Sequence, residues 1–316
     1  MLHPRSMNAL ARCLAAPGLR PGDPIAVCAP ASWVPGGVAE AVAARLEEAG
    51  YRVRLAPSCA RHEGFFAMPD EERADELNRL FADDSVRAIL CARGGYGSAR
   101  LLPFLDFDLV RRHPKLFIGF SDITALHAAL TQRAGLAVVH GPMAATLVEE
   151  KSVPETRDAF LAGLASPWRT GDLSAPFAGT LRPLCGGTAE GPLLGGNLSV
   201  LASLAGTPWA LRGDGAVLFL EEVGEKSYRI DRMMWQLEAE GLFSRIAGVV
   251  FGQFTACGAD DGDGTTEEVL AAWAERIARP AVAGLEAGHG RKNLFLPLGL
   301  PVRLDADGGR LDGLGA

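Results

Sequence analysis

Three residues of the chain have the complementary chemistry of a serine hydrolase: Ser121, Glu221 and His289. A serine hydroxyl is a good nucleophile only when an imidazole accepts its proton, and the imidazole needs a carboxylate to hold its tautomer. Each of the three follows an apolar stretch, where a side chain can stand clear of a sheet. The residue types therefore suit a catalytic triad, whereas their spacing along the chain does not show that they meet.

Each of these residues also has a structural interpretation. Ser121 and Asp122 belong to types preferred at helix N-termini, so they could simply cap the helical pattern that follows them. Glu221 could be the solvated end of a strand, and one of six histidines can flank glycines by chance. Residue type alone leaves both interpretations open.

The first half of the sequence alternates apolar strand-like stretches with helical patterns. Strands are expected at 25–30, 51–55, 86–92, 116–120 and 136–140, and helices at 38–48, 69–81 and 122–133. Strands that are apolar on both faces favour an α/β fold with a parallel sheet covered by helices, of the Rossmann or flavodoxin type. Active sites of such sheets lie beyond the carboxyl ends of the strands, where Ser121, Gly94-Gly95 and His140 fall.

The second half does not continue this alternation of strands and helices. The pattern loosens between 151 and 182, and short strands with many glycines follow. A strong strand at 216–220 leads into Glu221, a capping box at Thr265 and Glu268 predicts a helix to 277, and Asp307-Gly308-Gly309 predicts a hairpin. We expect a smaller C-terminal α/β domain with a β-rich, barrel-like core. The predicted division is an N-terminal extension (1–20), a nucleophile domain (21–150), a linker (151–182) and a C-terminal domain with Glu221 and His289 (183–316).

Composition excludes several classes of function. A net charge of −7 without a Lys/Arg-rich run argues against a nucleic-acid partner, and no apolar run is long enough for a membrane-spanning helix. The six cysteines form no CxxC pair, so we expect no metal and a reducing, cytoplasmic location. The N-terminus does not resemble a signal peptide, and Met7 is a candidate start besides Met1.

Common catalytic and cofactor motifs do not match. The stretch around Ser121 lacks the GxSxG pattern of an α/β-hydrolase elbow. The glycines at 95 and 97 lack the final glycine of a dinucleotide fingerprint, where Arg100 stands. We therefore expect no cofactor.

Several stretches together resemble the LD-carboxypeptidase family of serine peptidases, the muramoyltetrapeptide carboxypeptidases. They occur in family order over nearly the whole chain. The matching stretches are Arg93-Gly94-Gly95-Tyr96-Gly97, Gly119-Phe120-Ser121-Asp122-Ile123-Thr124, His140-Gly141-Pro142, Gly195-Gly196-Asn197-Leu198, Leu220-Glu221-Glu222-Val223, Tyr228-Arg229-Ile230-Asp231-Arg232, Gly288-His289-Gly290, Asn293 and Leu296-Pro297-Leu298-Gly299.

The resemblance implies a role for each candidate residue. Ser121 would be the nucleophile, His289 the general base and acid, and Glu221 the carboxylate that orients His289. The backbone N–H groups of Gly95 and Asp122 would form the oxyanion hole. Because Ser121 lies in the first predicted domain and its partners in the second, the site should form at the interface.

The family's substrate is the cell-wall tetrapeptide, from which terminal D-alanine is released by cleavage of an L,D-peptide bond during peptidoglycan recycling. The resemblance also implies a homodimer. An exopeptidase must bind a terminal carboxylate, for which a cation is well suited. Candidate substrate-binding residues are Arg93, Tyr96, Asn197 and Arg229, although an arginine such as Arg93 equally often braces a loop.

Two alternatives remain beside the cell-wall peptidase. A microcin-immunity-type peptidase would cleave an aminoacyl-adenylate-like toxin, but such enzymes have a longer segment with tryptophans before the glutamate. Here that segment is short and holds only Trp168 and Trp209. A non-catalytic module could instead bind a ligand between two α/β domains. It would have no need for all three of Ser121, Glu221 and His289.

Overall fold

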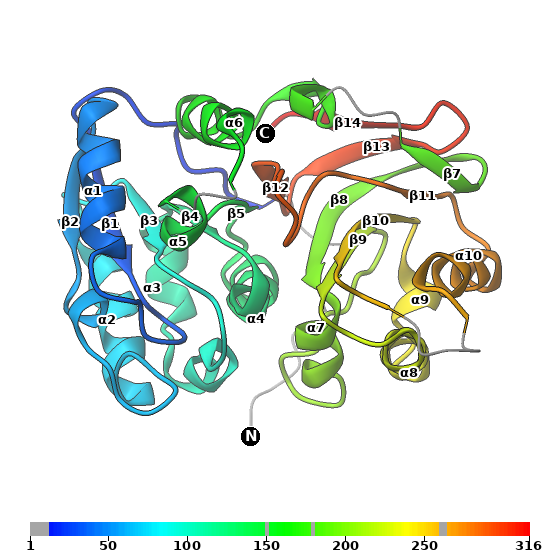
Figure 1. Cartoon of the computed structure of the whole chain (residues 1–316), viewed down its shortest axis with the longest axis horizontal. Helices are drawn as coiled ribbons and strands as arrows, with labels where there is room; N and C mark the ends of the chain where they lie inside the picture. The colour runs from blue at the N-terminus through cyan, green and yellow to red at the C-terminus, as the bar shows by residue number, and fades with distance from the viewer. Residues whose placement is uncertain (1–12, 149–151, 178–180, 259–263) are drawn as a thin grey trace.

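A computed structural model of the chain describes residues 13–148, 152–177, 181–258 and 264–316. Both candidate starts, Met1 and Met7, and most of the predicted N-terminal extension lie outside the described residues. Figure 1 shows two α/β halves side by side, each built on its own sheet. The fold class predicted from the sequence, a mixed α/β protein with a helix-covered parallel sheet, is confirmed.

The first sheet has the strand order β12-β5-β4-β3-β1-β2. Strands β1 to β5 run parallel, whereas β12 pairs antiparallel with β5. Their bounds are β1 (Pro24–Cys28), β2 (Arg52–Leu55), β3 (Ala88–Cys91), β4 (Leu116–Gly119), β5 (Val138–His140) and β12 (Leu296–Leu298). The helices of this half are α1 (Val38–Glu48), α2 (Asp70–Ala82), α3 (Phe107–Arg112), α4 (Thr124–Ala129), α5 (Ala144–Val148) and α6 (Pro154–Ala165).

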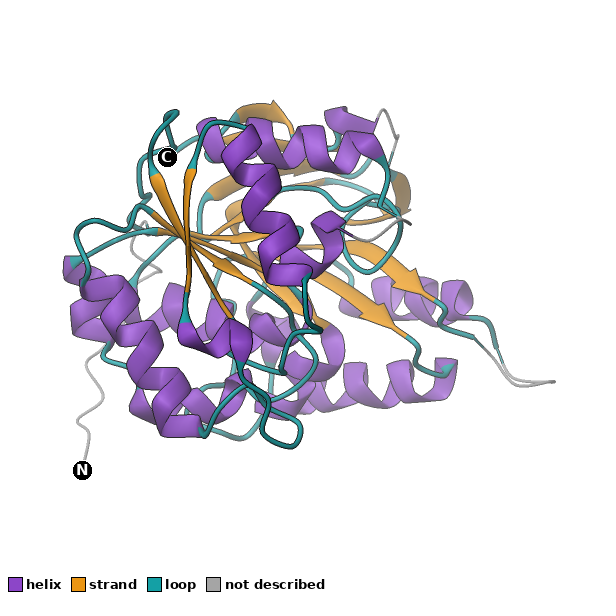
Figure 2. Ribbon diagram, turned by 60° about the vertical axis from the view of Figure 1, so that its left-hand side comes forward, coloured by secondary structure: helices purple, strands orange, loops and turns teal. Residues whose placement is uncertain are grey.

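Successive side chains along a strand point to opposite faces of the sheet, and here an apolar cluster buries each face. One apolar cluster joins Cys28 and Phe117 to Leu77 of α2, while the other joins Val27 and Ile118 to helices on the opposite face, α1 and α6. Figure 2 shows helices on both sides of these strands. This double covering explains why inner strands such as β3 and β4 are continuously apolar in the sequence, whereas the edge strand β2 carries two arginines.

The segment predicted as a linker contains regular structure. Helix α6 begins with Pro154 at its first turn, and Phe160 and Leu164 are buried against the first half. Strand β6 (Thr170–Asp172) pairs with β14 (Arg310–Leu314) of the second sheet. The loosened pattern at 151–182 therefore corresponds in part to short elements that pack on either half, and the domain boundaries themselves stay a prediction.

The second sheet has the order β6-β14-β13-β8-β9-β10-β11-β7. Its remaining strands are β7 (Arg182–Cys185), β8 (Thr188–Asn197), β9 (Val217–Val223), β10 (Gly248–Thr255), β11 (Ala281–Ala283), β13 (Pro301–Asp305) and β14 (Arg310–Leu314). Its helices are α7 (Leu198–Leu204), α8 (Ser227–Ala239), α9 (Leu242–Arg245) and α10 (Thr266–Ile277). Among the described strands β6 and β7 are edges, so the sheet is open and the expected barrel-like closure is not formed. The predicted hairpin and the capping box at Thr265 are confirmed.

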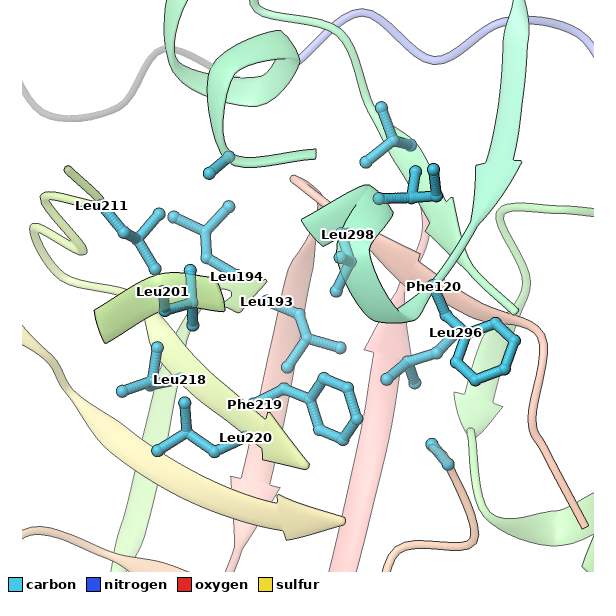
Figure 3. Packing of buried hydrophobic residues seen from close by; sticks show 14 of the residues in the cluster. Phe120, Leu193, Leu194, Leu201, Leu211, Leu218, Phe219, Leu220, Leu296 and Leu298 are labelled. Carbon is cyan, nitrogen blue, oxygen red and sulfur yellow. The ribbon is translucent and has the colours of Figure 1, made fainter. Parts of the chain in front are cut away.

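One apolar cluster extends across both sheets. Figure 3 shows Phe120, which follows β4, packed near Leu296 of β12, with Leu193 of β8 and Phe219 of β9 in the same cluster. Interior packing of this kind resists relative movement of the parts it joins. In the described part of the chain, no helix is both long enough and apolar enough to cross a membrane.

Candidate active site

Ser121 occupies a strained turn at the end of a central strand. Strand β4 ends at Gly119, and a short 3-10 turn from Ser121 to Ile123 leads into α4. The φ angle of Ser121 is +62°, in the left-handed region that a residue with a side chain rarely adopts. Gly119 permits the sharp turn, since a Cβ there would lie 2.7 Å from the Ile123 side chain. Backbone strain of this kind costs about 1–3 kcal/mol and is concentrated at functional sites.

The structure brings Ser121, His289 and Glu221 into one hydrogen-bonded chain. The His289 Nε2 atom lies 2.9 Å from Ser121 Oγ, and its Nδ1 atom lies 2.7 Å from Glu221 Oε2. Both distances are those of hydrogen bonds. An Nδ1–H that donates to Glu221 leaves Nε2 free to accept the serine proton, so the arrangement can activate the hydroxyl.

Glu221 is held inside the second sheet. It lies in β9, and its side chain is fully buried. The other carboxylate oxygen, Oε1, has no hydrogen-bond partner among the described residues, so His289 is the partner that the geometry gives this carboxylate. Gly288 lies against it: a Cβ there would approach Glu221 Oε2 to 2.7 Å, and its φ of +131° also favours glycine.

The loop of His289 is fixed on both sides of the imidazole. The N–H of Gly288 donates to Asn293 Oδ1 at 3.1 Å, and the N–H of Gly290 donates to Gln253 Oε1 at 2.7 Å. The ring of Phe120 lies 4.9 Å from the imidazole, between centroids. These contacts hold the ring in one orientation toward Ser121.

The glycine loop after β3 lies directly on the serine turn. A Cβ at Gly94 would come within 3.0 Å of Ser121 Cβ and 3.2 Å of the Asp122 nitrogen. The Asp122 carboxylate accepts the N–H of Ser98 at 2.8 Å, and Ser98 Oγ donates to the Asp122 carbonyl at 2.5 Å. Burial raises the pKa of Asp122. The predicted oxyanion donors, Gly95 and Asp122, thus belong to two segments tied together beside Ser121, and their role stays a prediction.

Two predicted substrate-binding residues belong to the same loop. Arg93 donates to the carbonyl of Trp33 at 3.2 Å, and its guanidinium lies 5.9 Å from the Trp33 ring centroid. Tyr96 is 54% exposed, and its backbone N–H donates to Ser32 Oγ at 3.0 Å. Arg93 therefore braces the Trp33 loop in this structure, while the Tyr96 ring remains accessible.

The other two predicted substrate-binding residues, Asn197 and Arg229, form contacts within the second half. Asn197 is buried as the N-cap of α7: its Oδ1 accepts the N–H of Val200, and its Nδ2 donates to Glu222 Oε1 at 3.1 Å. The amide thus links the start of α7 to Glu222 and is almost inaccessible to solvent. Arg229 is exposed on α8 and pairs with Glu225 at 3.4 Å. Asparagine directly before a helix is a capping signal that sequence interpretation could have used.

A buried histidine near the site was not assigned a role from the sequence. His140, at the end of β5, is fully buried, and its ring centroid lies 5.7 Å from that of Phe120 and 4.9 Å from that of Phe219. Burial holds its pKa well below the ordinary value, so the ring is neutral. Within the described residues, no group of three or more His, Cys, Asp or Glu side chains is arranged to hold a metal.

Comparisons with known proteins agree over nearly the whole chain. Residues 25–141 match the LD-carboxypeptidase N-terminal domain, and residues 190–304 match the C-terminal domain of the same family. A probable murein peptide carboxypeptidase of Bacillus subtilis is 37% identical over 91% of this chain and 90% of its own length. The crystal structure of muramoyltetrapeptide carboxypeptidase from Oxalobacter formigenes superposes with a TM-score of 0.81 at 31% identity, covering 92% of this chain and 97% of the other. A microcin self-immunity protein of Escherichia coli is 27% identical over 83% of each chain.

Proposed function

Because the chain belongs to the LD-carboxypeptidase family, we propose that it is a serine carboxypeptidase that releases terminal D-alanine from a muramoyl tetrapeptide by hydrolysis of an L,D-peptide bond. The observation that carries the proposal is the Ser121–His289–Glu221 hydrogen-bonded chain. The names of the murein and muramoyltetrapeptide carboxypeptidases to which the chain is similar supply the substrate class.

In the first half of the reaction, Ser121 Oγ attacks the carbonyl carbon of the scissile bond. His289 Nε2 takes the hydroxyl proton, and Glu221 stabilises the imidazolium that results. When the tetrahedral intermediate collapses, the C–N bond breaks and His289 gives its proton to the departing D-alanine amine. An acyl ester on Ser121 remains.

Water completes the cycle. His289 removes a proton from a water molecule, which attacks the acyl ester, and then returns the proton to Ser121 as the ester bond breaks. In both halves the negative charge on the substrate oxygen would be stabilised by the N–H groups of Gly95 and Asp122. Removal of one such donor typically costs about 10²–10³ in rate.

The remaining parts of the proposal follow from the family and the composition. We propose the residue ranges 21–150 and 183–316 as the two domains, with the site between them. All six cysteines are free thiols, which supports a reducing, cytoplasmic location and a role in peptidoglycan recycling. A homodimer is proposed from the family alone.

The microcin-immunity alternative is supported by the similarity to the Escherichia coli protein. That similarity is lower than the similarity to the murein peptide carboxypeptidase. A non-catalytic binding module is disfavoured because a binder does not need the strained Ser121 or a buried carboxylate aimed at His289.

The test is release of D-alanine from purified muramoyl tetrapeptide by the wild type and by Ser121→Ala. We expect release by the wild type, none above background by the variant, and none from an analogue that ends in L-alanine. A folded wild type that releases no D-alanine would refute the substrate assignment, and aminoacyl sulfamoyl nucleosides would then test the microcin alternative. Release that persists in Ser121→Ala would refute the nucleophile.

A further inference from the structure

A buried hydrogen bond joins the helix that follows Ser121 to the strand that lies beside the strand of Glu221. Thr124 is the first residue of α4, shortly after Ser121, and its side chain is fully buried. Its Oγ1 accepts the backbone N–H of Asn197 at 2.9 Å. Ser121 and Thr124 belong to the half with the first sheet, whereas Asn197 is the last residue of β8 in the second. The bond therefore crosses between the halves.

The far end of this bond lies beside the triad carboxylate. Asn197 is the register partner of Glu221 in the parallel pairing of β8 with β9. The carboxylate of the adjacent Glu222 accepts hydrogen bonds from Asn197 Nδ2 at 3.1 Å and from the N–H of Ser199 at 2.7 Å. The position of Asn197 is thereby fixed to the strand from which Glu221 projects.

The two halves also approach each other closely at this point. A Cβ at Gly196 would lie 2.5 Å from Thr124 Oγ1, and Gly196 has a φ of +141°. Only a residue without a side chain lets the β8 backbone come this near to α4. The packing of Gly196 against Thr124 therefore defines the spacing between the two halves at this point.

We propose that Thr124 is a positioning residue for catalysis: its hydroxyl sets the spacing between the serine turn and the strand of Glu221. The inference rests on the proposed function, because it concerns the same triad. A reacting constellation must be held within about 0.5 Å of its productive geometry. The bond from Thr124 to Asn197 links the segment of Ser121 to the strand paired with that of Glu221, so its loss should change how His289 meets the hydroxyl.

The test compares Thr124→Val with Thr124→Ser. Valine keeps the shape of threonine but cannot accept the Asn197 N–H, whereas serine retains the acceptor. We expect the valine variant to lose about 10- to 100-fold in kcat with KM changed less than about twofold, and the serine variant to recover most of kcat. The matched control is Thr131→Val, because Thr131 is also buried but its hydroxyl donates to nearby helix carbonyls, those of His127 and Ala128.

A second readout separates this inference from the substrate assignment. A small fluorophosphonate forms a bond to Ser121 Oγ as fluoride leaves and His289 takes the proton, so its labelling rate reports triad geometry without a peptide. Slow labelling in Thr124→Val, with wild-type rates in Thr124→Ser and Thr131→Val, supports the inference even if D-alanine is not released. Equal labelling and equal kcat in a folded Thr124→Val would overturn it, as would an equal loss in all three variants. Failure of the wild type to label at Ser121 would overturn both proposals.

Discussion

The carboxylate of Asp122 accepts a hydrogen bond from the backbone N–H of Ser98 at 2.8 Å. The bond fastens the residue next to Ser121 to the end of the glycine loop that contains Gly95. The two N–H groups proposed as oxyanion donors are thus held by a side chain that need not touch the substrate. A backbone site of this kind is effective because its donors are already oriented before the charge develops.

Replacement of Asp122 tests this arrangement. Asp122→Ala removes the acceptor and should lower kcat by about 10- to 100-fold, since misplaced donors stabilise the oxyanion less well. Asp122→Asn keeps an oxygen that can accept the Ser98 N–H and should retain more activity. Steady-state kinetics on the tetrapeptide measure both, with Asp108→Ala, at an exposed side chain of α3, as the control. Wild-type kcat in a folded Asp122→Ala would contradict the proposed role.

The neighbours Glu221 and Glu222 should respond differently to amide substitution. Glu221→Gln can present an N–H to His289 and favour the wrong tautomer, which in other triads lowers kcat by about 10⁴. Glu222→Gln would face the N–H of Ser199 with an amide group, so we expect a loss of stability of about 1 kcal/mol and a much smaller effect on kcat. Thermal unfolding and kcat of the two variants provide the comparison. Similar kcat values for both would argue against Glu221 as the orienting carboxylate.

Gly94 should tolerate no side chain. A Cβ there would lie 3.0 Å from Ser121 Cβ, so Gly94→Ala must displace the serine turn or the glycine loop. We expect a fall in kcat of about 100-fold, the scale associated with a 1 Å misplacement of reacting groups. Gly36→Ala is the matched control, because a Cβ at Gly36 has nothing within 4 Å. If Gly94→Ala and Gly36→Ala were equally active, the close packing would have no catalytic consequence.

Stability should depend on pH through the buried His127. Burial lowers its pKa to about 3 from an ordinary value of 6.5. Between these values the unfolded chain binds the proton and the folded protein does not, so this contribution to stability is complete above about pH 6.5 and is lost as the pH falls toward 3. We expect His127→Phe to reduce the slope of unfolding free energy against pH in this window, by at most about 1.4 kcal/mol per pH unit.

Urea unfolding between pH 4.5 and 7 measures these slopes. His62→Gln, at an exposed histidine, is the control for removal of an imidazole. His127→Phe is compared by slope rather than by absolute stability, because the larger ring can alter packing at every pH. Parallel curves for the wild type and His127→Phe would contradict the assignment.

The sequence predicted the elements whose patterns are local. Strand β4 and α1 could be placed because continuous apolar residues and a 3.6-residue period each have one main structural meaning. Strand β12, with only Leu296, Pro297 and Leu298, has no such pattern, and its partner β5 is distant in the chain. Its place in the first sheet is decided by tertiary packing, which local periodicity does not encode.

The candidate site likewise combines residues that the sequence indicates with contacts that only tertiary packing decides. Ser121, Glu221 and His289 could be named because their types suggest one reaction and their stretches resemble one family. The capping role of Asn197 competes with substrate binding in the sequence, and only the bonds to Val200 and Glu222 distinguish them. Thr124 ends a stretch that resembles the family, but its contact could not be predicted from the sequence, since its partner is a backbone N–H in the other half.

The pairing of β12 with β5 has a consequence for how the protein is made. The edge of β5 is exposed on the nascent chain until residues 296–298 have been synthesised, although the four strands beside it can assemble much earlier. An unpaired strand edge is a template for unwanted association. We therefore expect the first half, while still on the ribosome, to be an aggregation-prone intermediate that benefits from chaperones. The pairing of β12 with β5 would be a late step that completes the first sheet and brings the His289 loop to Ser121.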